Sequence, residues 1–230
     1  MPAVATAGPL SRLDLGGGSQ PVPMMVLLAG MSLLPFAVLM LTSFSKIAVV
    51  LSLARSALGT QQAPPSMVLT GLAAVLTAHI MAPVAEAMYL AGRDADAGFE
   101  TGAQLISTAE RVADPLRSFL IKHASPEERA RFADLARELR PLEQADQVTE
   151  LDLAVILPAF VITELKEAFQ IGFLVFLPFL VVDMVIANIL LALGMQSLSP
   201  SQVSLPFKIL LFVAVDGWAL LSRGLVLGYR

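Results

Sequence analysis

The stretch from residue 158 to residue 193 constrains this chain more than any other. Its first part carries Glu164, Lys166 and Glu167 at helical spacing, and the apolar part that follows has Asp183 as its single charged residue. That apolar part is about 20 residues long, which is what a helix needs to cross the hydrocarbon core of a bilayer. The sequence therefore predicts a helix that begins at a polar surface and then becomes buried on all sides.

The composition supports a membrane protein or a very apolar assembly. Hydrophobic residues make up 56% of the 230 residues and charged residues 15%, against about 25% charged residues in an ordinary soluble domain. The chain has no cysteine, which excludes disulfides and thiolate metal sites. His79 and His123 lie far apart in sequence and lack a local partner motif, so we expect no metal site.

The charges are concentrated in one block. Residues 93–150 contain 8 basic and 12 acidic residues, which accounts for the whole net charge of -4. We expect this block to face water between two apolar halves. The chain has no basic patch with interleaved aromatic residues, so we expect no nucleic-acid partner.

Four parts follow from these patterns, and all of them are predicted to be helical or irregular, which makes the fold class all-α. Residues 1–21 read as a mobile N-terminal tail without a cleaved signal peptide. Residues 22–92 form a first apolar helical hairpin with Lys46 and Arg55 in its turn region, residues 93–150 the soluble block, and residues 151–230 a second apolar hairpin. Each hairpin supplies two of the four predicted apolar segments.

Two helix starts are predicted inside the soluble block. Asp114 precedes Pro115, a pairing typical of an N-cap followed by proline at the first helical position. Ser125 and Glu128 form a second, capping-box pattern, in which Glu127 and Arg131 are spaced for an i,i+4 ion pair. The block is therefore predicted to contain two amphipathic helices that pack on each other or on a neighbour.

Several charged residues lie in or beside the apolar segments. A carboxylate at the centre of a membrane helix costs about 2.5 to 3.5 kcal/mol on insertion scales, so these groups need partners. Basic and acidic residues occur in matching number: Lys46, Arg55, Lys166, Lys208 and Arg223 against Glu86, Glu164, Glu167, Asp183 and Asp216. We expect pairing between helices or between subunits, with a proton or ion path and snorkelling at helix ends as the alternatives.

Prolines interrupt every long apolar segment, at Pro35, Pro83, Pro178 and Pro206. The carbonyls that they free must be satisfied by neighbouring protein, which favours an oligomer. Basic residues near the two hairpin turns favour a cytoplasmic location for those turns and an external location for residues 93–150.

Catalytic patterns are missing from the sequence. Asp183 and Asp216 on different apolar segments suggest an intramembrane aspartyl protease, but neither follows the Gly-x-Gly motif of those enzymes. A secondary transporter or ion channel that uses the same two aspartates is a further alternative. Because no phosphate-binding loop ending in Gly-Lys-Ser/Thr is present, the chain is not expected to be an NTPase, and we expect no cofactor and no enzymatic activity.

Two stretches, residues 158–173 and residues 205–218, closely resemble the two signatures of the FliP/SctR family, which includes YscR and HrcR. Members of this family are core export-gate subunits of type III secretion systems. The resemblance implies a non-enzymatic pore subunit of the bacterial inner membrane, a multi-pass protein with residues 93–150 in the periplasm. It also implies a protein-conducting pore for unfolded secreted proteins.

The resemblance further implies particular partners. These are a homo-oligomer, in the family a pentamer, together with a small two-helix export-gate subunit and a larger export-gate subunit present in one copy. A large export-gate protein and a secretion ATPase lie nearby in such systems, and unfolded substrate proteins pass through the assembled gate.

The resemblance assigns a pore constriction to the turn of residues 194–201. The family carries a methionine cluster there, whereas this chain has Met195, Gln196, Ser197 and Leu198. A methionine ring could grip varied chains while it blocks ions. A plain polar turn is the alternative interpretation of these residues.

The remaining assignments concern charge pairs and packing. Glu164, Lys166 and Lys208 match charged positions of the signatures and, with Asp183 and Asp216, are predicted to form inter-helix or inter-subunit pairs. The predicted packing anchors are Pro158, Phe160, Phe169, Gly172, Pro206, Phe207, Gly217 and Trp218. Asn188, Ser199-Pro200 and the reduced methionine content resemble the virulence-associated branch, so an injectisome is favoured over a flagellum.

Overall fold

The computed structural model describes residues 21–60, 63–93, 102–195 and 197–230. All secondary structure in these ranges is helical, which confirms the predicted all-α class. The helices are α1 (Pro21–Met40), α2 (Phe44–Leu58), α3 (Ser66–Arg93), α4 (Gly102–His123), α5 (Pro126–Glu138), α6 (Leu142–Ala145), α7 (Leu153–Ala192), α8 (Pro200–Ala214) and α9 (Gly217–Leu227). The predicted N-terminal tail lies almost entirely outside the described residues.

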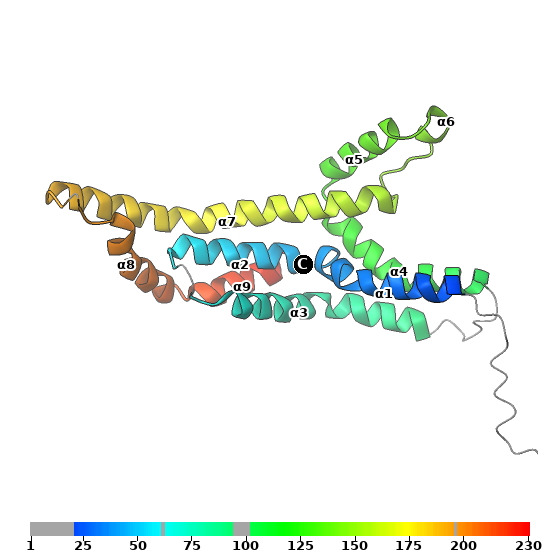
Figure 1. The fold of residues 1–230 in the computed structure, drawn as a ribbon, viewed down its shortest axis with the longest axis horizontal. Helices are drawn as coiled ribbons and strands as arrows, with labels where there is room; N and C mark the ends of the chain where they lie inside the picture. Colours follow the sequence, from blue (N-terminus) through cyan, green and yellow to red (C-terminus); the bar gives the residue numbers. More distant parts are fainter. Residues whose placement is uncertain (1–20, 61–62, 94–101, 196) are drawn as a thin grey trace, which may run out of the picture. The chain divides into compact units, whose positions relative to one another are not determined.

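The chain divides into two compact units, residues 1–36 and residues 37–230. The first unit contributes most of α1, a helix of 20 residues with Pro35 inside it. In the second unit, α2 packs against both α7 and α3, and α4 and α5 pack against α7 (Figure 1). The second unit contains helices α2 to α9.

Helix α2 supplies the centre of the core. Ile47, Val50 and Leu51 are 0% exposed and form a cluster with Leu69 of α3 and Leu225 of α9. These three residues recur at the 3–4 residue spacing that places side chains on one face of a helix. The helix ends at Gly59, whose left-handed φ of 76° suits a residue without a Cβ atom.

A second cluster joins the soluble block to the start of α7. Phe119 and Leu120 of α4 pack against Ile156 and Phe160 of α7, and Phe160 is 0% exposed. Tyr229, which follows α9, belongs to the same cluster. The soluble block is therefore attached to the apolar helices through a buried interface.

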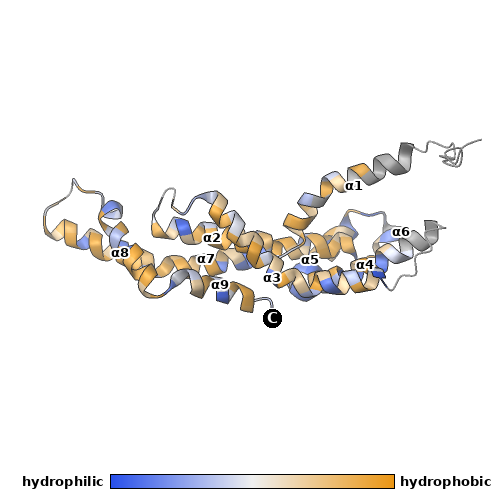
Figure 2. Cartoon of the chain, turned by 90° about the horizontal axis from the view of Figure 1, so that it is seen from below, coloured by the Kyte–Doolittle hydropathy of each residue, from blue (hydrophilic) through white to orange (hydrophobic). Residues whose placement is uncertain are grey.

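Helix α7 is the longest element, with 40 residues. At 1.5 Å per residue it spans about 60 Å, roughly twice the hydrocarbon thickness of a bilayer. By length and composition, α3 and α7 could each cross a membrane, and up to four spans result if each bent helix pair in the described chain counts as one. Figure 2 shows that apolar residues occur along the whole of α7, α8 and α9.

Three details of the predicted organisation are wrong. The turn region of the first hairpin is itself largely helix α2, so Lys46 and Arg55 lie on a helix. The apolar segment after residue 203 is two helices, because the chain bends by 58° between α8 and α9. The backbone of Asp216 at this bend has a left-handed φ of 50°, which ends α8.

The third error concerns the helix start at Asp114. Helix α4 begins at Gly102 and continues through Pro115, although an internal proline removes one backbone hydrogen bond. Along its length α4 packs against α3. The two helices are so close that a Cβ atom added to Gly92 of α3 would lie 3.4 Å from the Val112 side chain of α4. Tertiary contacts therefore outweigh the local cost of the proline.

The other helix start of the block is confirmed. The Ser125 hydroxyl accepts a hydrogen bond from the Glu128 backbone N–H at 3.2 Å, as an N-cap does. The Ser125 N–H itself donates to the Thr163 hydroxyl of α7 at 3.0 Å. The predicted ion pair between Glu127 and Arg131 is present at 2.6 Å.

Candidate functional site

A buried polar cluster joins α2 to α7. Lys46 of α2 forms ion pairs with Glu167 and with Glu164, whose Oε1 atom lies 3.7 Å from the lysine Nζ atom. The Lys46 and Glu164 side chains are 4% and 1% exposed, whereas that of Glu167 is 46% exposed. The Tyr229 hydroxyl donates to the other carboxylate oxygen, Oε2, of Glu164.

Aromatic rings enclose this cluster. The Lys46 ammonium lies 4.5 Å from the centre of the Tyr229 ring, a cation–π distance. Phe119 and His123 of α4 pack on the same ring, with centroid distances of 6.0 and 5.0 Å. Burial is the main cause that raises the pKa of Tyr229, and it also lowers the pKa of His123, where Lys122 and Lys46 act in the same direction.

A second polar cluster holds α8 against α7. Lys208 of α8 is buried, and its Nζ atom lies 2.6 Å from the Asp183 carboxylate of α7. The Ser204 hydroxyl, one helical turn before Lys208, donates to the other oxygen of Asp183, and Lys208 also donates to the Ala57 carbonyl of α2 at 3.5 Å. We call Asp183, Ser204 and Lys208 the α8 clasp.

Lys166 faces the soluble block. Its Nζ atom lies 3.6 Å from Glu128 and 3.8 Å from Glu127, both in α5, and its side chain is 49% exposed. These weaker pairs, with the bond from Ser125 to Thr163, connect α5 to the middle of α7. Of the five charged residues in the two signature stretches, all except Asp216 thus have an ion-pair partner within the same chain.

The turn after α7 is a helix C-cap motif. The Gly194 N–H donates to the Leu191 carbonyl, and the Met195 N–H donates to the Leu190 carbonyl, with a left-handed φ of 71° at Gly194. This is the Schellman arrangement that commonly ends helices. Met195 and Leu198 are each 43% exposed and Ser197 is exposed, while Gln196 lies outside the described residues.

The bend between α8 and α9 is packed around one aromatic ring. A Cβ atom on Gly217 would overlap the Phe212 ring, and Trp218 meets that ring edge-on at 5.1 Å. The exposed Asp216 forms no ion pair within the described chain, so the structure brings it to no other predicted charge partner. The two aspartates of the protease and transporter hypotheses therefore differ: Asp183 is paired with Lys208, whereas Asp216 is exposed.

The predicted packing anchors fall into two groups. Phe160, Gly172 and Gly217 are buried and Pro158 and Trp218 are half-buried, and the Gly172 backbone lies directly against Leu53 of α2. In contrast, Phe169 and Phe207 are 55% and 53% exposed and Pro206 is exposed. The second group is free to contact something outside this chain.

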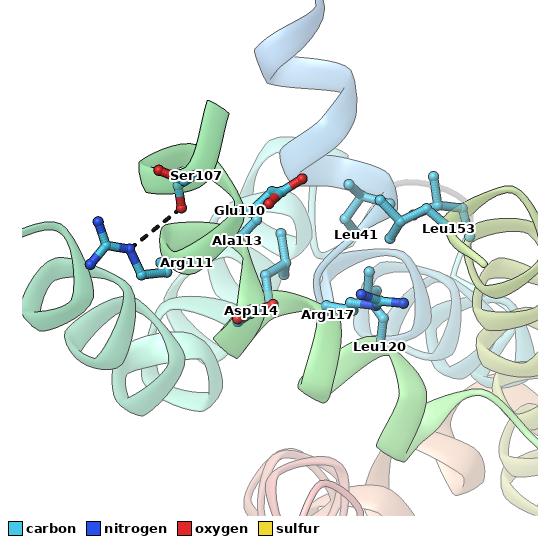
Figure 3. Close-up of a pocket in the computed structure, with 11 residues that line it drawn as sticks. Leu41, Ser107, Glu110, Arg111, Ala113, Asp114, Arg117, Leu120 and Leu153 are labelled. Carbon is cyan, nitrogen blue, oxygen red and sulfur yellow. Dashed lines mark hydrogen bonds between the residues drawn. The ribbon is translucent and has the colours of Figure 1, made fainter. Parts of the chain in front are cut away.

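A cavity of about 750 Å³ lies where α4 meets the start of α7 (Figure 3). Leu41, Leu120 and Leu153 supply apolar walls, and Leu41 and Leu153 approach α4 from one side. The charged residues that line it, Glu110, Arg111, Asp114 and Arg117, cancel one another. The described residues contain no group of three His, Cys, Asp or Glu side chains placed to hold a metal ion.

Sequence reasoning missed two members of the two clusters, Tyr229 and Ser204, and it named Lys46 and Glu167 without matching them to each other. Glu167 and Lys46 lie 121 residues apart, and Tyr229 lies 65 residues from Glu164, so no local pattern connects them. Ser204 could have been found, because it precedes Lys208 by four residues and so shares its helix face. The signal for the ion pairs was the matching number of acids and bases near apolar segments.

Long apolar helices with buried ion pairs and a charged helical block define an all-α protein of the membrane type. The FliP family pattern matches residues 27–225, and the chain belongs to this family, as the two signature stretches predicted. The Hypersensitivity response secretion protein HrcR of Ralstonia nicotianae is 47% identical over 90% of this chain and 96% of its own length. The Yop proteins translocation protein R of Yersinia pestis is 45% identical with the same coverage, and the Flagellar biosynthetic protein FliP of Caulobacter vibrioides is 42% identical over 100% of this chain and 86% of its own.

Proposed function

We propose that this protein is a non-enzymatic core subunit of a type III secretion export gate, and that several copies form a protein-conducting pore for unfolded secreted proteins. The observation that carries the proposal is the α7–α8 hairpin. Its tip exposes Met195 and Leu198, while the α8 clasp closes its two helices on each other. A ring of such tips would present apolar, flexible side chains to a passing chain.

Assembly into an oligomer is supported by the apolar surface that one chain leaves uncovered. Phe169 and Phe173 of α7 and Phe207 and Val213 of α8 are each more than half exposed. We propose that copies of this chain, five by analogy with the family, cover these surfaces together with a small two-helix subunit and a larger single-copy subunit. A large export-gate protein and a secretion ATPase complete the surroundings.

We place the assembly in the bacterial inner membrane. The helix lengths of α3 and α7 support membrane insertion, and the charged block of α4 and α5 supports a water-facing periplasmic part. The hairpin turns then face the cytoplasm, in line with the basic residues near them.

The composition of the turn supports an injectisome rather than a flagellum. Residues 194–201 contain one methionine, which is the feature that favours the injectisome, since relatives named for hypersensitivity response secretion, pathogenicity or Yop translocation reach 44 to 47% identity and flagellar biosynthetic relatives reach 42 and 46%. Deletion of the gene should therefore stop secretion of virulence effectors and leave motility intact. Loss of motility with normal effector secretion would assign the protein to a flagellum instead.

A single introduced cysteine tests the pore arrangement, because the natural chain has none. Met195→Cys should give disulfide-linked or bismaleimide-linked dimers of neighbouring copies, because each copy carries a single thiol, and cross-links to a cysteine placed in a substrate stalled during export. Met67→Cys is the matched control, since this methionine is 84% exposed and lies at the start of α3. Equal cross-linking at both positions, or only monomers at Met195, would disprove the ring of hairpin tips.

The transporter and protease alternatives predict a different outcome. Both need Asp183 and Asp216 as functional groups, so Asp183→Asn and Asp216→Asn would each abolish an activity while the assembly stays intact. In the proposed gate, Asp216→Asn leaves secretion unchanged, and Asp183→Asn acts through loss of the α8 clasp.

A further inference from the structure

The polar cluster between α2 and α7 holds an excess of acid. Two carboxylates, from Glu164 and Glu167, share the one ammonium group of Lys46. If all three side chains were ionised, the cluster would hold one net negative charge. One of its two carboxylates, that of Glu164, is 1% exposed. Because Lys46 makes its closer contact with the half-exposed Glu167, an ionised Glu164 is poorly compensated in its buried position, and one more positive charge there would stabilise the cluster.

The free position for that charge is the Oε1 atom of Glu164. This buried atom has no hydrogen-bond partner within the described chain, and its nearest charged neighbour is the Lys46 Nζ atom at 3.7 Å. Lys46 makes its closer contact with Glu167. The other oxygen of Glu164 accepts the Tyr229 hydroxyl, which is a neutral donor.

The neighbouring elements do not supply the missing cation. Lys166 on α7 is turned to Glu127 and Glu128 of α5. From α4, His123 packs on the Tyr229 ring, and the charges of Lys46 and Lys122 together with burial favour its neutral form. Lys122 is exposed to solvent.

We propose that Glu164 is a proton-binding site, in which its Oε1 atom carries the proton and Lys46 remains paired with Glu167. When two carboxylates share one site, mutual repulsion keeps one of them protonated. Glu167, whose side chain is 46% exposed, is the member of the cluster that reaches solvent. This inference rests on the cluster alone and is independent of the export role.

Release of the proton has a structural consequence. The new negative charge on Glu164 draws Lys46 away from Glu167 and toward the buried side of the cluster. Because Lys46 belongs to α2 and both glutamates belong to α7, the ion pairing between these two helices then depends on protonation. Tyr229, stacked on Phe119, couples the same change to α4.

Infrared spectroscopy of the purified full-length protein in its complex tests the site. At pH 7 the wild type should show the carbonyl-stretching band of one buried, protonated carboxyl group. Glu164→Gln should remove the band, and Glu150→Gln, at an exposed acid in the soluble block, should retain it. The proposal is overturned if the wild type lacks the band or if a folded Glu164→Gln protein keeps it.

A second variant decides the question even if Glu164→Gln does not fold. Glu167→Gln removes the surplus acid and leaves Glu164 and Lys46 as a one-to-one pair. Glu164 should then ionise, so that the band loses at least half of its intensity at pH 7. A band of unchanged intensity in Glu167→Gln would show that the shared charge does not keep Glu164 protonated, and would refute the inference.

Discussion

The α8 clasp gives the sharpest prediction of stability. Lys208→Met keeps the length of the side chain but removes the ammonium group that lies 2.6 Å from Asp183. Removal of one partner from a fully buried pair costs about 3 to 5 kcal/mol. Asp183 is 30% exposed and keeps its bond from Ser204, so water and the hydroxyl recover part of that cost, and we expect about 2 to 4 kcal/mol.

Lys166→Met is the matched control. Lys166 is also a lysine in a signature stretch, but its side chain is 49% exposed and its ion pairs are longer, at 3.6 and 3.8 Å. An exposed pair of this kind contributes about 0.2 to 1 kcal/mol. The two variants therefore differ in how deeply the same chemical group is buried.

Equilibrium unfolding in detergent, followed by the fluorescence of Trp218, measures both effects. Trp218 is the single tryptophan of the chain and packs on Phe212. Phe212 lies one helical turn after Lys208, so the fluorescence reports on the region of the clasp. Asp183→Asn combined with Lys208→Met should give a coupling energy of at least about 1 kcal/mol in a double-mutant cycle. Equal losses for Lys208→Met and Lys166→Met, or a Lys208→Glu protein that still forms a stable, secreting complex, would refute the role of the clasp.

Three further predictions follow from backbone geometry and burial. Gly172→Ala places a methyl group against the Leu53 side chain and should destabilise the protein by about 1 to 3 kcal/mol. Gly71 has open space around it, so Gly71→Ala should stabilise α3 by about 0.5 to 1 kcal/mol in the same unfolding measurement. Gly194→Ala strains a left-handed residue and should cost about 1 to 2 kcal/mol, with Gly194→Asn less harmful. Because the pKa of His123 is lowered in the folded protein, the unfolded chain binds a proton more readily than the folded chain does. The free energy of unfolding should therefore fall as the pH drops below about 6.5. His123→Gln should flatten this dependence, measured as melting temperature against pH.

Local patterns in the sequence predicted local features of the structure. The Ser125 cap and the pair of Glu127 and Arg131 depend on residues within one helical turn, and both are present. The helix start at Asp114 was wrong because the decisive contacts of α4 are with α3, which the capping pattern does not encode. Local signals therefore failed where tertiary packing outweighed them.

The sequence predicted that the charged residues near the apolar segments need partners, but it did not predict which residues pair. Five acids and five bases near apolar segments required pairing, yet many arrangements satisfy that balance. The structure selects Lys46 with Glu164 and Glu167, over separations of more than 100 residues, because α2 lies along α7. Helix packing chooses the partners, and it is a property of the whole fold.

This internal pairing changes what can hold copies of the chain together. Lys46, Lys166 and Lys208 are already paired within one chain, and among the charged residues near apolar segments Glu86, Asp216 and Arg223 remain exposed without an ion pair in the described residues. The uncovered surfaces of α7 and α8 are mostly apolar.

Contacts between subunits should therefore be mainly apolar, and salt should weaken them little. At 1 M salt the screening length falls to about 3 Å, which suppresses exposed ion pairs but not apolar contacts. The purified complex should keep its mass in 1 M NaCl, as measured by light scattering, while Phe173→Ser at the exposed face of α7 should dissociate it. Dissociation of the wild-type complex by salt alone would mean that ion pairs, rather than apolar packing, join the subunits.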